Sequence, residues 1–255
     1  MRRLWGVAPP LLLMAVLLGA WELACRVLQV PAYLLPTPSS IGVALAQNAP
    51  ALAVAAGRTL GMALQALIAA SLFAGALALA VSLSRALGQA VRPLAVALQV
   101  TPVVAIAPLF VIWAGVDHPQ RAIVALAAIV AFFPIFSGAT RGLASADPDL
   151  ERLFDLYGAS RIQRLLRLGL PSAVPFLVEG HKVAAGLAII GAVVAEFVAG
   201  SGGAQGLAWR ILEAGNRLQT AKMFAAIITL ALMAAGLHAL FQALERRALV
   251  WWRGR

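Results

Sequence analysis

Lysine, histidine and serine are the side chains from which this chain could build a nucleotide-binding or catalytic site. A phosphate-binding loop ends in Gly-Lys followed by Ser or Thr, whose side chains reach the phosphates and their metal. Valine follows Lys182 and methionine follows Lys222, so the chain has no such loop and is not itself a P-loop ATPase.

The three histidines lie far apart, and no His-Glu-x-x-His pair for zinc occurs. The segment AGSGG at 199–203 misses the G-x-S-G pattern of intramembrane serine proteases, because alanine takes the first position. We therefore predict that the chain is not an enzyme and binds no metal or cofactor itself.

The most concentrated group of charged side chains occupies residues 147–171, DPDLERLFDLYGASRIQRLLRLGLP. Acidic residues gather toward its beginning and arginines toward its end, as the dipole of a helix favours. Apolar residues recur at helical spacing on both sides of Gly158: Leu150, Leu153, Phe154 and Tyr157, then Ile162, Leu165 and Leu166. The pattern predicts two amphipathic half-helices with a bend at the glycine, the second ended by Leu170-Pro171.

A helix lying on lipid headgroups is the simplest interpretation of this alternation of arginine and leucine. That interpretation explains the arginines, but it does not explain Phe154 and Tyr157, which stand among acidic residues. We favour a protein partner that accepts the apolar face, and the lipid surface is the alternative.

The elements that must hold this segment are mostly apolar. The chain is 62% hydrophobic with a mean hydropathy of +0.90, and 12% of its residues are charged. A soluble domain has about a quarter of its residues charged, and a helix needs ~20 apolar residues to span a bilayer. Six stretches meet this length: 4–28, 59–84, 93–116, 122–140, 175–200 and 223–244. We predict an all-α integral membrane protein with six transmembrane helices.

The first stretch could instead be a cleaved signal peptide, since MRR precedes an apolar run. However, Trp5 and Trp21 bracket it about 24 Å apart, as interfacial anchors do. Glu22 and Arg26 lie one turn apart and can neutralise each other. We expect a retained helix.

Basic residues are distributed unevenly between the predicted loops. With a cytoplasmic N-terminus, six spans place 84–92, 141–172 and 245–255 on the cytoplasmic side, with 13 of the 20 basic residues. Those 13 are Arg2, Arg3, Arg85, Arg92, Arg141, Arg152, Arg161, Arg164, Arg167, Arg246, Arg247, Arg253 and Arg255. This bias predicts that both termini are cytoplasmic. It also accounts for the net charge of +10 without a nucleic-acid partner.

Five residues outside the charged segment are candidates for the transport path or for partner binding. Pro102 and Pro108 should kink or break the third helix, either as a purely structural kink or as part of a translocation path. Glu196 is the only acid near a mid-membrane position, so it is either a structural hydrogen-bonding residue or part of an outer gate or dimer seam. Arg210 and Arg217 lie on the predicted outer side and either dock a solute-binding protein or are simply solvated.

The predicted outer side carries two longer segments. Residues 29–57 contain no charge, and LLPTPSS predicts an extended turn followed by a short helix capped by Ser39 or Ser40. Residues 200–220 begin with glycines and continue as a short amphipathic helix.

The charged segment resembles the EAA loop of bacterial ABC importer permeases, whose pattern is Glu-Ala-Ala, three residues, glycine, and a spacer ending in Leu-Pro. Gly158 and Leu170-Pro171 match in spacing, and GAS at 158–160 is the usual continuation. Arg152, Leu153 and Phe154 stand where the family has Glu-Ala-Ala, with Glu151 displaced by one position. The segments LLPTPSSI, TPVVAIAPLFVIWAG, FFPIFSGATRGL and VVAEFVAG are similar to segments of the nitrate/sulfonate/taurine-type permeases.

This resemblance implies the inner-membrane permease of an importer that works as a homodimer. Two cytoplasmic ATPase subunits would use ATP, and a periplasmic or tethered solute-binding protein would deliver the solute. The coupling residues would be Glu151, Arg152, Leu153, Phe154, Tyr157, Gly158, Ala159, Ser160, Leu170 and Pro171. The implied layout is an N-terminal transmembrane helix (1–28), an outer loop (29–57), a permease core (58–247) containing a cytoplasmic coupling-helix loop (141–172), and a cytoplasmic tail (248–255).

Members of this family carry sulfonates, nitrate and taurine, and similar permeases serve vitamins and their precursors, such as riboflavin and thiamine pyrimidines. The segment AEFVAGSGGAQGLAWRILEAGNRLQ favours the vitamin-precursor branch. A secondary transporter is one alternative, and it would need coupling-ion residues near the mid-membrane. A non-transporting membrane assembly subunit is the other. Adjacent genes for an ATPase and a solute-binding protein would discriminate the three functions.

Overall fold

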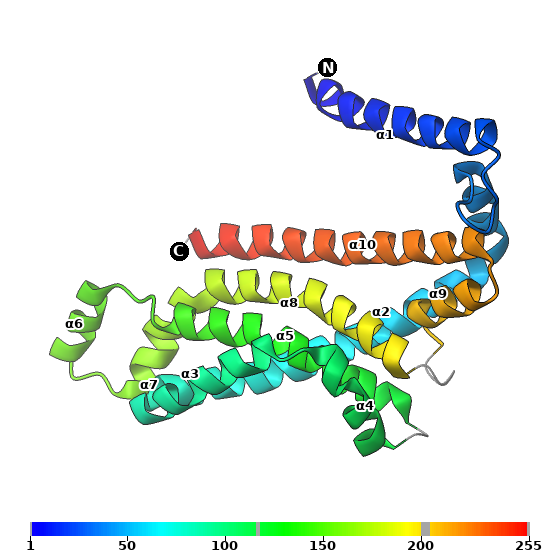
Figure 1. Ribbon diagram of the computed structural model, residues 1–255. Coiled ribbons are helices and arrows are strands. Elements are labelled where there is room, and N and C mark those ends of the chain that lie inside the picture. The colour runs from blue at the N-terminus through cyan, green and yellow to red at the C-terminus, as the bar shows by residue number, and fades with distance from the viewer. Residues whose placement is uncertain (1, 116–117, 200–204, 254–255) are drawn as a thin grey trace. The chain divides into compact units, whose positions relative to one another are not determined.

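The computed structural model describes residues 2–115, 118–199 and 205–253, and all regular structure in these ranges is helical (Figure 1). The elements are α1 Arg2–Val27, α2 Pro38–Leu83, α3 Arg85–Val100, α4 Val103–Ala114, α5 Pro119–Leu143, α6 Pro148–Leu156, α7 Arg161–Arg164, the π-helix η1 Leu165–Gly169, α8 Leu170–Ala199, α9 Leu207–Asn216 and α10 Thr220–Arg253. The predicted all-α membrane fold is confirmed.

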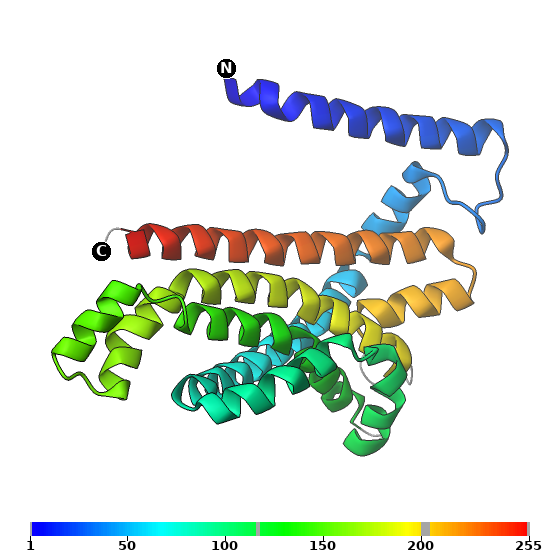
Figure 2. The ribbon, with the colours of Figure 1, turned by 60° about the vertical axis from the view of Figure 1, so that its left-hand side comes forward.

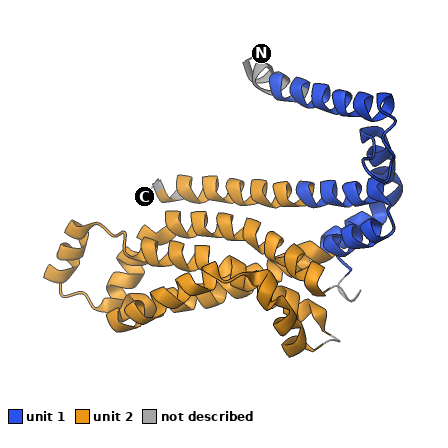
Figure 3. Ribbon diagram, viewed as in Figure 1, with its two compact units in different colours: residues 1–57, 205–231 blue, residues 58–204, 232–255 orange. Residues whose placement is uncertain are grey.

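The helices form two compact units (Figure 3). Unit 1 comprises Met1–Gly57 and Gln205–Ala231, and unit 2 comprises Arg58–Ala204 and Leu232–Arg255. The two longest helices, α2 and α10, each begin in unit 1 and continue into unit 2.

Among the described residues, four helical stretches are long and apolar enough to cross a membrane: Pro38–Leu83, Pro119–Leu143, Arg161–Ala199 and Thr220–Val250. A fifth span results if the bent pair α3 and α4 counts as one. These stretches cover five of the predicted spans, and α1 is a helix of 26 residues over the sixth. The fold class is therefore established, whereas the exact count of six remains a prediction.

The predicted loop at 29–57 is mostly helix, because α2 already begins at Pro38 and runs for 46 residues. Its N-cap is Thr37, and the prediction of Ser39 or Ser40 is wrong. The hydroxyl of Thr37 accepts a hydrogen bond from the backbone N–H of Ser40 at 3.3 Å, and Pro38 takes the first helical position, where no N–H is needed.

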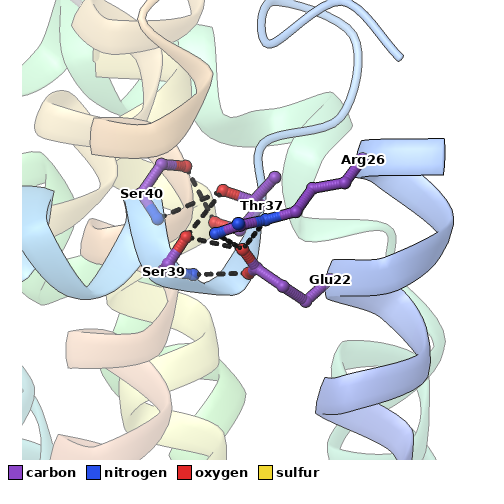
Figure 4. Close-up of polar contacts among 5 residues, drawn as sticks. All are labelled: Glu22, Arg26, Thr37, Ser39 and Ser40. Atoms are coloured by element: carbon purple, nitrogen blue, oxygen red, sulfur yellow. Dashed lines mark hydrogen bonds and ion pairs between the residues drawn. The ribbon is translucent and has the colours of Figure 1, made fainter. Parts of the chain in front are cut away.

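Glu22 of α1 completes this cap (Figure 4). Its carboxylate accepts hydrogen bonds from the backbone N–H of Ser39 at 2.9 Å and from the Ser39 hydroxyl at 2.8 Å. The same carboxylate pairs with Arg26 at 2.6 Å, as the one-turn spacing predicted. The end of α1 is thereby joined to the start of α2 by polar contacts.

The third predicted span is broken. α3 and α4 meet at an angle of 98° around Thr101 and Pro102. Thr101 is extended (φ −69°, ψ 125°), the conformation that a following proline favours, and Pro102 occupies the N-cap position of α4. The predicted break is confirmed at Pro102, while Pro108 lies within α4 without ending it.

Helices α5 and α8 pack closely within unit 2, and glycines set their separation. A Cβ atom on Gly138 would lie 2.7 Å from the carbonyl oxygen of Phe176, and one on Gly180 would lie 2.8 Å from that of Pro134. The same is true of two further glycines that face backbone or Cβ atoms of the opposite helix, Gly142 and Gly191. In lipid, where helices gain little from burying apolar surface, such close backbone contact supplies much of the attraction.

One end of unit 2 brings together segments that are far apart in sequence. A single cavity is lined by residues 82–85, by Leu143, Ala146 and Glu151, and by five residues between 161 and 169. The indole N–H of Trp252 donates a hydrogen bond to the carbonyl oxygen of Pro171 at 2.7 Å, which places the end of α10 there as well. α6 and α7 extend from this same end, beyond α5 and α8, in both ribbon views (Figures 1 and 2). The sequence assigned these segments to one side of the membrane, and which side they face remains a prediction.

Candidate coupling site

Residues 147–171, here called the coupling segment, form two half-helices joined by a tight turn. Asp147 is the N-cap of α6, and its carboxylate accepts a hydrogen bond from the backbone N–H of Asp149 at 2.8 Å. Pro148 takes the first helical position, and acidic residues occupy the first turn, where the helix dipole favours them. Local sequence therefore fixes the start of α6 without help from the membrane helices.

The turn after α6 is a Schellman motif centred on Gly158. The N–H groups of Gly158 and Ala159 donate to the carbonyl oxygens of Asp155 and Phe154, both at 3.0 Å. Gly158 has φ +63°, in the left-handed region that glycine adopts without strain. The predicted bend at this glycine is confirmed.

The second half-helix begins with a capping box. The Ser160 hydroxyl accepts the backbone N–H of Gln163 at 3.3 Å, and the Gln163 side chain accepts the backbone N–H of Ser160 at 2.8 Å. An ion pair between Arg164 and Asp155 joins the two half-helices across the turn. These contacts give the exposed segment a defined shape.

The apolar side of the coupling segment is uncovered. Leu156 is 86% exposed and Tyr157 is 83% exposed, and none of the residues of α6 is buried. Ile162 and Leu166 continue the exposed apolar surface into the second half. The sequence pattern identified Tyr157, Ile162 and Leu166 but missed Leu156, because its position is off the face defined by Leu150, Leu153 and Phe154.

The prediction that Leu170-Pro171 ends the second half-helix is wrong. The chain continues through the π-helical turn η1 into α8, and the N–H of Leu170 bonds to the carbonyl of Leu165, five residues back. Proline has no N–H and its ring crowds the preceding turn, and a widened turn removes that crowding. The coupling segment is thus joined directly to a membrane helix, without an intervening loop.

Glu196 lies inside unit 2, not at its surface. Its side chain is 2% exposed, and one carboxylate oxygen accepts a hydrogen bond at 3.3 Å from the hydroxyl of Thr59, which is fully buried. α2 and α8 are thereby linked by a polar pair within an apolar interior.

We expect Glu196→Ala to lower the thermal stability of the permease in detergent, because it removes the carboxylate that accepts the hydrogen bond of the Thr59 hydroxyl in the apolar interior. A hydrogen bond to a charged group contributes about 1.5–3 kcal/mol. Glu196→Gln keeps an acceptor of the same length and should restore most of that stability. Glu179→Ala removes an exposed acid from the same helix and serves as the control. If stability and solute uptake are unchanged in Glu196→Ala, the residue has neither a structural nor a gating role.

Arg210 and Arg217 lie together in unit 1, where both pair with Glu213 of α9 at 3.1 Å. With Asn48 and Lys222 they line a cavity of about 150 Å³. Three cationic side chains against one carboxylate leave this cavity positive. The sequence had identified the two arginines but not the glutamate that holds them.

The remaining site candidates are Pro102, at the N-cap of the apolar helix α4, and Pro108, within that helix. Both therefore belong to the shorter of the two helices that make up the broken third span. A role of these prolines in a translocation path remains a prediction.

The family model for the inner membrane component of binding-protein-dependent transport systems matches residues 67–250 of this chain. The chain belongs to this family. The resemblance recognised in the sequence is confirmed, and the permease is an integral component of the inner membrane.

Individual relatives cover nearly the whole permease. It is 32% identical over 257 residues to the formylaminopyrimidine transport permease protein ThiX of Halalkalibacterium halodurans, covering 98% of both chains. It is 31% identical over 221 residues to a probable ABC transporter permease protein of Haemophilus influenzae, covering 87% of this chain and 88% of the relative. It is 27% identical over 258 residues to the putative aliphatic sulfonates transport permease protein SsuC of Bacillus subtilis, covering 98% and 90%.

Proposed function

We propose that this permease is the membrane-spanning subunit of an ATP-driven importer and couples to a separate ATPase through residues 147–171. The observation that carries the proposal is the uncovered apolar surface around Leu156 and Tyr157, held in a defined shape by a Schellman turn and a capping box. Two large apolar side chains at more than 80% exposure, outside the apolar helices, favour a protein partner over water. The coupling segment continues without a break into α8. A partner that moves the segment would therefore also move this helix.

The end of unit 2 with the coupling segment would face the cytoplasm, where ATP is available. The concentration of arginine in the segments that meet there supports this orientation, because cytoplasmic loops are enriched in basic residues. The working assembly would be a homodimer of this chain with two ATPase subunits and a solute-binding protein on the outer side.

For the solute we propose a vitamin precursor of the formylaminopyrimidine type. Support comes from the match to ThiX, which is 32% identical over 98% of both chains. An aliphatic sulfonate is the second candidate, supported by the match to SsuC at 27% identity.

The test of this function is uptake into vesicles that contain the permease together with its ATPase and its solute-binding protein. We expect ATP-dependent accumulation of labelled formylaminopyrimidine in excess of labelled aliphatic sulfonate. Accumulation without ATP, driven by an ion gradient, would instead identify a secondary transporter, and no accumulation of any solute would favour an assembly subunit.

Arg210 and Arg217 would dock the solute-binding protein, since their cavity in unit 1 is positive and sits on the predicted outer side. Reversing both charges with glutamate should lower the stimulation of ATP hydrolysis by the solute-binding protein at least several-fold, through repulsion of its carboxylates. Arg121→Glu changes another exposed arginine of the predicted outer side, which does not line this cavity, and should leave stimulation intact. Equal stimulation of the double variant and the control would place the docking surface elsewhere.

A further inference from the structure

Two adjoining cavities lie at the end of unit 2 that carries the coupling segment. The larger, about 860 Å³, lies between the end of α2, the start of α3, the end of α5 and residues 161–169. The smaller, about 360 Å³, extends along α3 and α5. The two share three lining residues, Ser82, Arg85 and Leu143, so they adjoin, and together they are here called the hollow.

The lining of this hollow is strongly cationic. It contains one acidic side chain, Glu151, and four arginines, Arg85, Arg92, Arg161 and Arg164. Arg164 pairs with Asp155, while the other three arginines form no ion pair with any residue in the described ranges. Like charges held around one hollow repel each other, and an anion between them would remove that repulsion.

The guanidinium of Arg164 also has a hydrogen-bond donor that is not satisfied by any described residue. Its Nε atom is buried, and it has no hydrogen-bond partner among the described residues, although the same guanidinium holds Asp155. A buried donor without a partner costs free energy, and such a group in a native structure calls for an acceptor. An oxyanion in the hollow would supply that acceptor.

The start of α3 adds to the positive potential. Ser84 caps this helix of 16 residues, so its first N–H groups and the positive end of its dipole lie beside Arg85 at the hollow.

We propose that this hollow binds a phosphate group, held by arginines of α3 and of the second half of the coupling segment. Arginine forks match the oxygens of a tetrahedral phosphate, and donors that converge from separate helices can surround it. The phosphate would belong either to the headgroup of an anionic phospholipid or to a soluble phosphate compound. The hollow lies where α2 and α5 end, and the ends of membrane-spanning helices are expected near the headgroups. Basic pockets between membrane helices hold such headgroups. This inference goes beyond the import function and does not depend on it.

A phosphate bound here would also connect the coupling segment to the rest of unit 2. Arg161 and Arg164 belong to the segment, whereas Arg85 and Arg92 belong to α3. Phosphate binding would therefore restrict the motion of residues 161–169, through which the coupling segment continues into α8.

The test uses the purified full-length permease in a zwitterionic detergent, and it reads out Tm together with the lipid adducts seen by native mass spectrometry. Phosphatidylglycerol, phosphatidylcholine and inorganic phosphate are added separately, with sodium chloride at matched ionic strength as the blank. We expect phosphatidylglycerol to raise Tm by roughly 2–4 °C and to remain bound in the spectrum, and phosphatidylcholine to do neither.

Two variants locate the site. Arg85→Gln and Arg161→Gln each remove an exposed lining arginine, and both should lose at least half of the rise in Tm and of the bound lipid. Arg141→Gln removes an exposed arginine from the same end of unit 2 that does not line the hollow, and it should behave as the wild type.

The outcomes separate the possible sources of the phosphate. A rise with phosphatidylglycerol alone identifies a lipid headgroup, and a rise with inorganic phosphate identifies a soluble compound. The proposal is wrong if neither probe raises Tm, or if both lining variants keep the full rise. It is also wrong if neither probe binds and the lining variants lose only co-purification with the ATPase, because the arginines would then belong to a protein interface.

Discussion

Gly158→Val should lower solute uptake by roughly tenfold or more while the permease stays inserted in the membrane. Gly158 has φ +63°, and a left-handed conformation costs a residue with a Cβ about 1–2 kcal/mol, with a β-branched side chain at the upper end. A factor of ten in an equilibrium corresponds to ~1.4 kcal/mol, so strain of this size lowers the ratio of the native turn to competing conformations by roughly five- to thirtyfold. No atom lies within 4 Å of the position that a Cβ would take, so the substitution acts on the backbone alone.

The loss should arise at the ATPase. When the Schellman turn opens, Leu156 and Tyr157 no longer hold a fixed direction relative to the helix that starts at Ser160. Gly158→Asn is the matched control, because asparagine enters the same open space but adopts left-handed conformations far more readily than valine. Uptake and co-purification of the ATPase are measured in one preparation. A segment that merely lies on lipid would tolerate the valine, so normal uptake with a fully bound ATPase would place the coupling site elsewhere.

Gly180→Val should prevent the permease from reaching a stable folded state. A Cβ at this position of α8 would lie 2.8 Å from the carbonyl oxygen of Pro134 in α5, and the next contacts, at 3.5–3.6 Å, are also with the backbone of α5. Backbone atoms cannot rotate away as a side chain can, so the two helices must separate. Overpacking costs typically 1–3 kcal/mol even where only side chains have to move, so the cost here is on the order of that or greater.

The control for this substitution is on the same helix. Gly186 is exposed, and no atom lies within 4 Å of the position of its Cβ, so Gly186→Val changes composition without crowding α5. The yield of monodisperse protein after detergent extraction, and its Tm, measure the difference. Equal yield and Tm for the two variants would show that the close approach of α5 and α8 does not hold unit 2 together.

The sequence predicts the membrane-spanning parts of this fold well, because hydrophobicity and length are local properties. α5 and α10 each cover a predicted span without charged residues, and α8 covers residues 175–199 of a third predicted span. The bend at Gly158 is equally local, since a glycine between two amphipathic patterns is the residue that a left-handed turn requires.

The long helix α2 was missed in part, although a periodic pattern for it was present. The prolines of LLPTPSS and Pro50 are typical of a loop. In the structure Pro50 is accommodated within the helix. Ile41, Ala44, Leu52 and Ala55 are buried at helical spacing, and this repeat could have revealed the helix.

The polar contacts that join elements could not be predicted from sequence. Glu22 bonds Ser39 across 17 residues, Trp252 bonds Pro171 across 81, and Thr59 bonds Glu196 across 137. Such pairs depend on how helices pack, which no local pattern contains. The π-helical turn at η1 is of the same kind: a Leu-Pro pair usually ends a helix, and here a widened turn lets it continue.

Site-specific crosslinking from the coupling segment tests the central claim most directly. The single cysteine, Cys25, is buried, so Leu156→Cys introduces one accessible thiol into the importer's membrane subunit. A bifunctional thiol–amine reagent is applied to membranes that contain the permease with its ATPase and solute-binding protein. Leu218→Cys, at a residue 68% exposed in unit 1 on the predicted outer side, is the control.

We predict a covalent adduct between the permease and the ATPase from position 156, with a yield that changes on addition of ATP, and none from position 218. An assembled complex with no ATPase adduct at position 156 would contradict the assignment of residues 147–171 as the coupling segment.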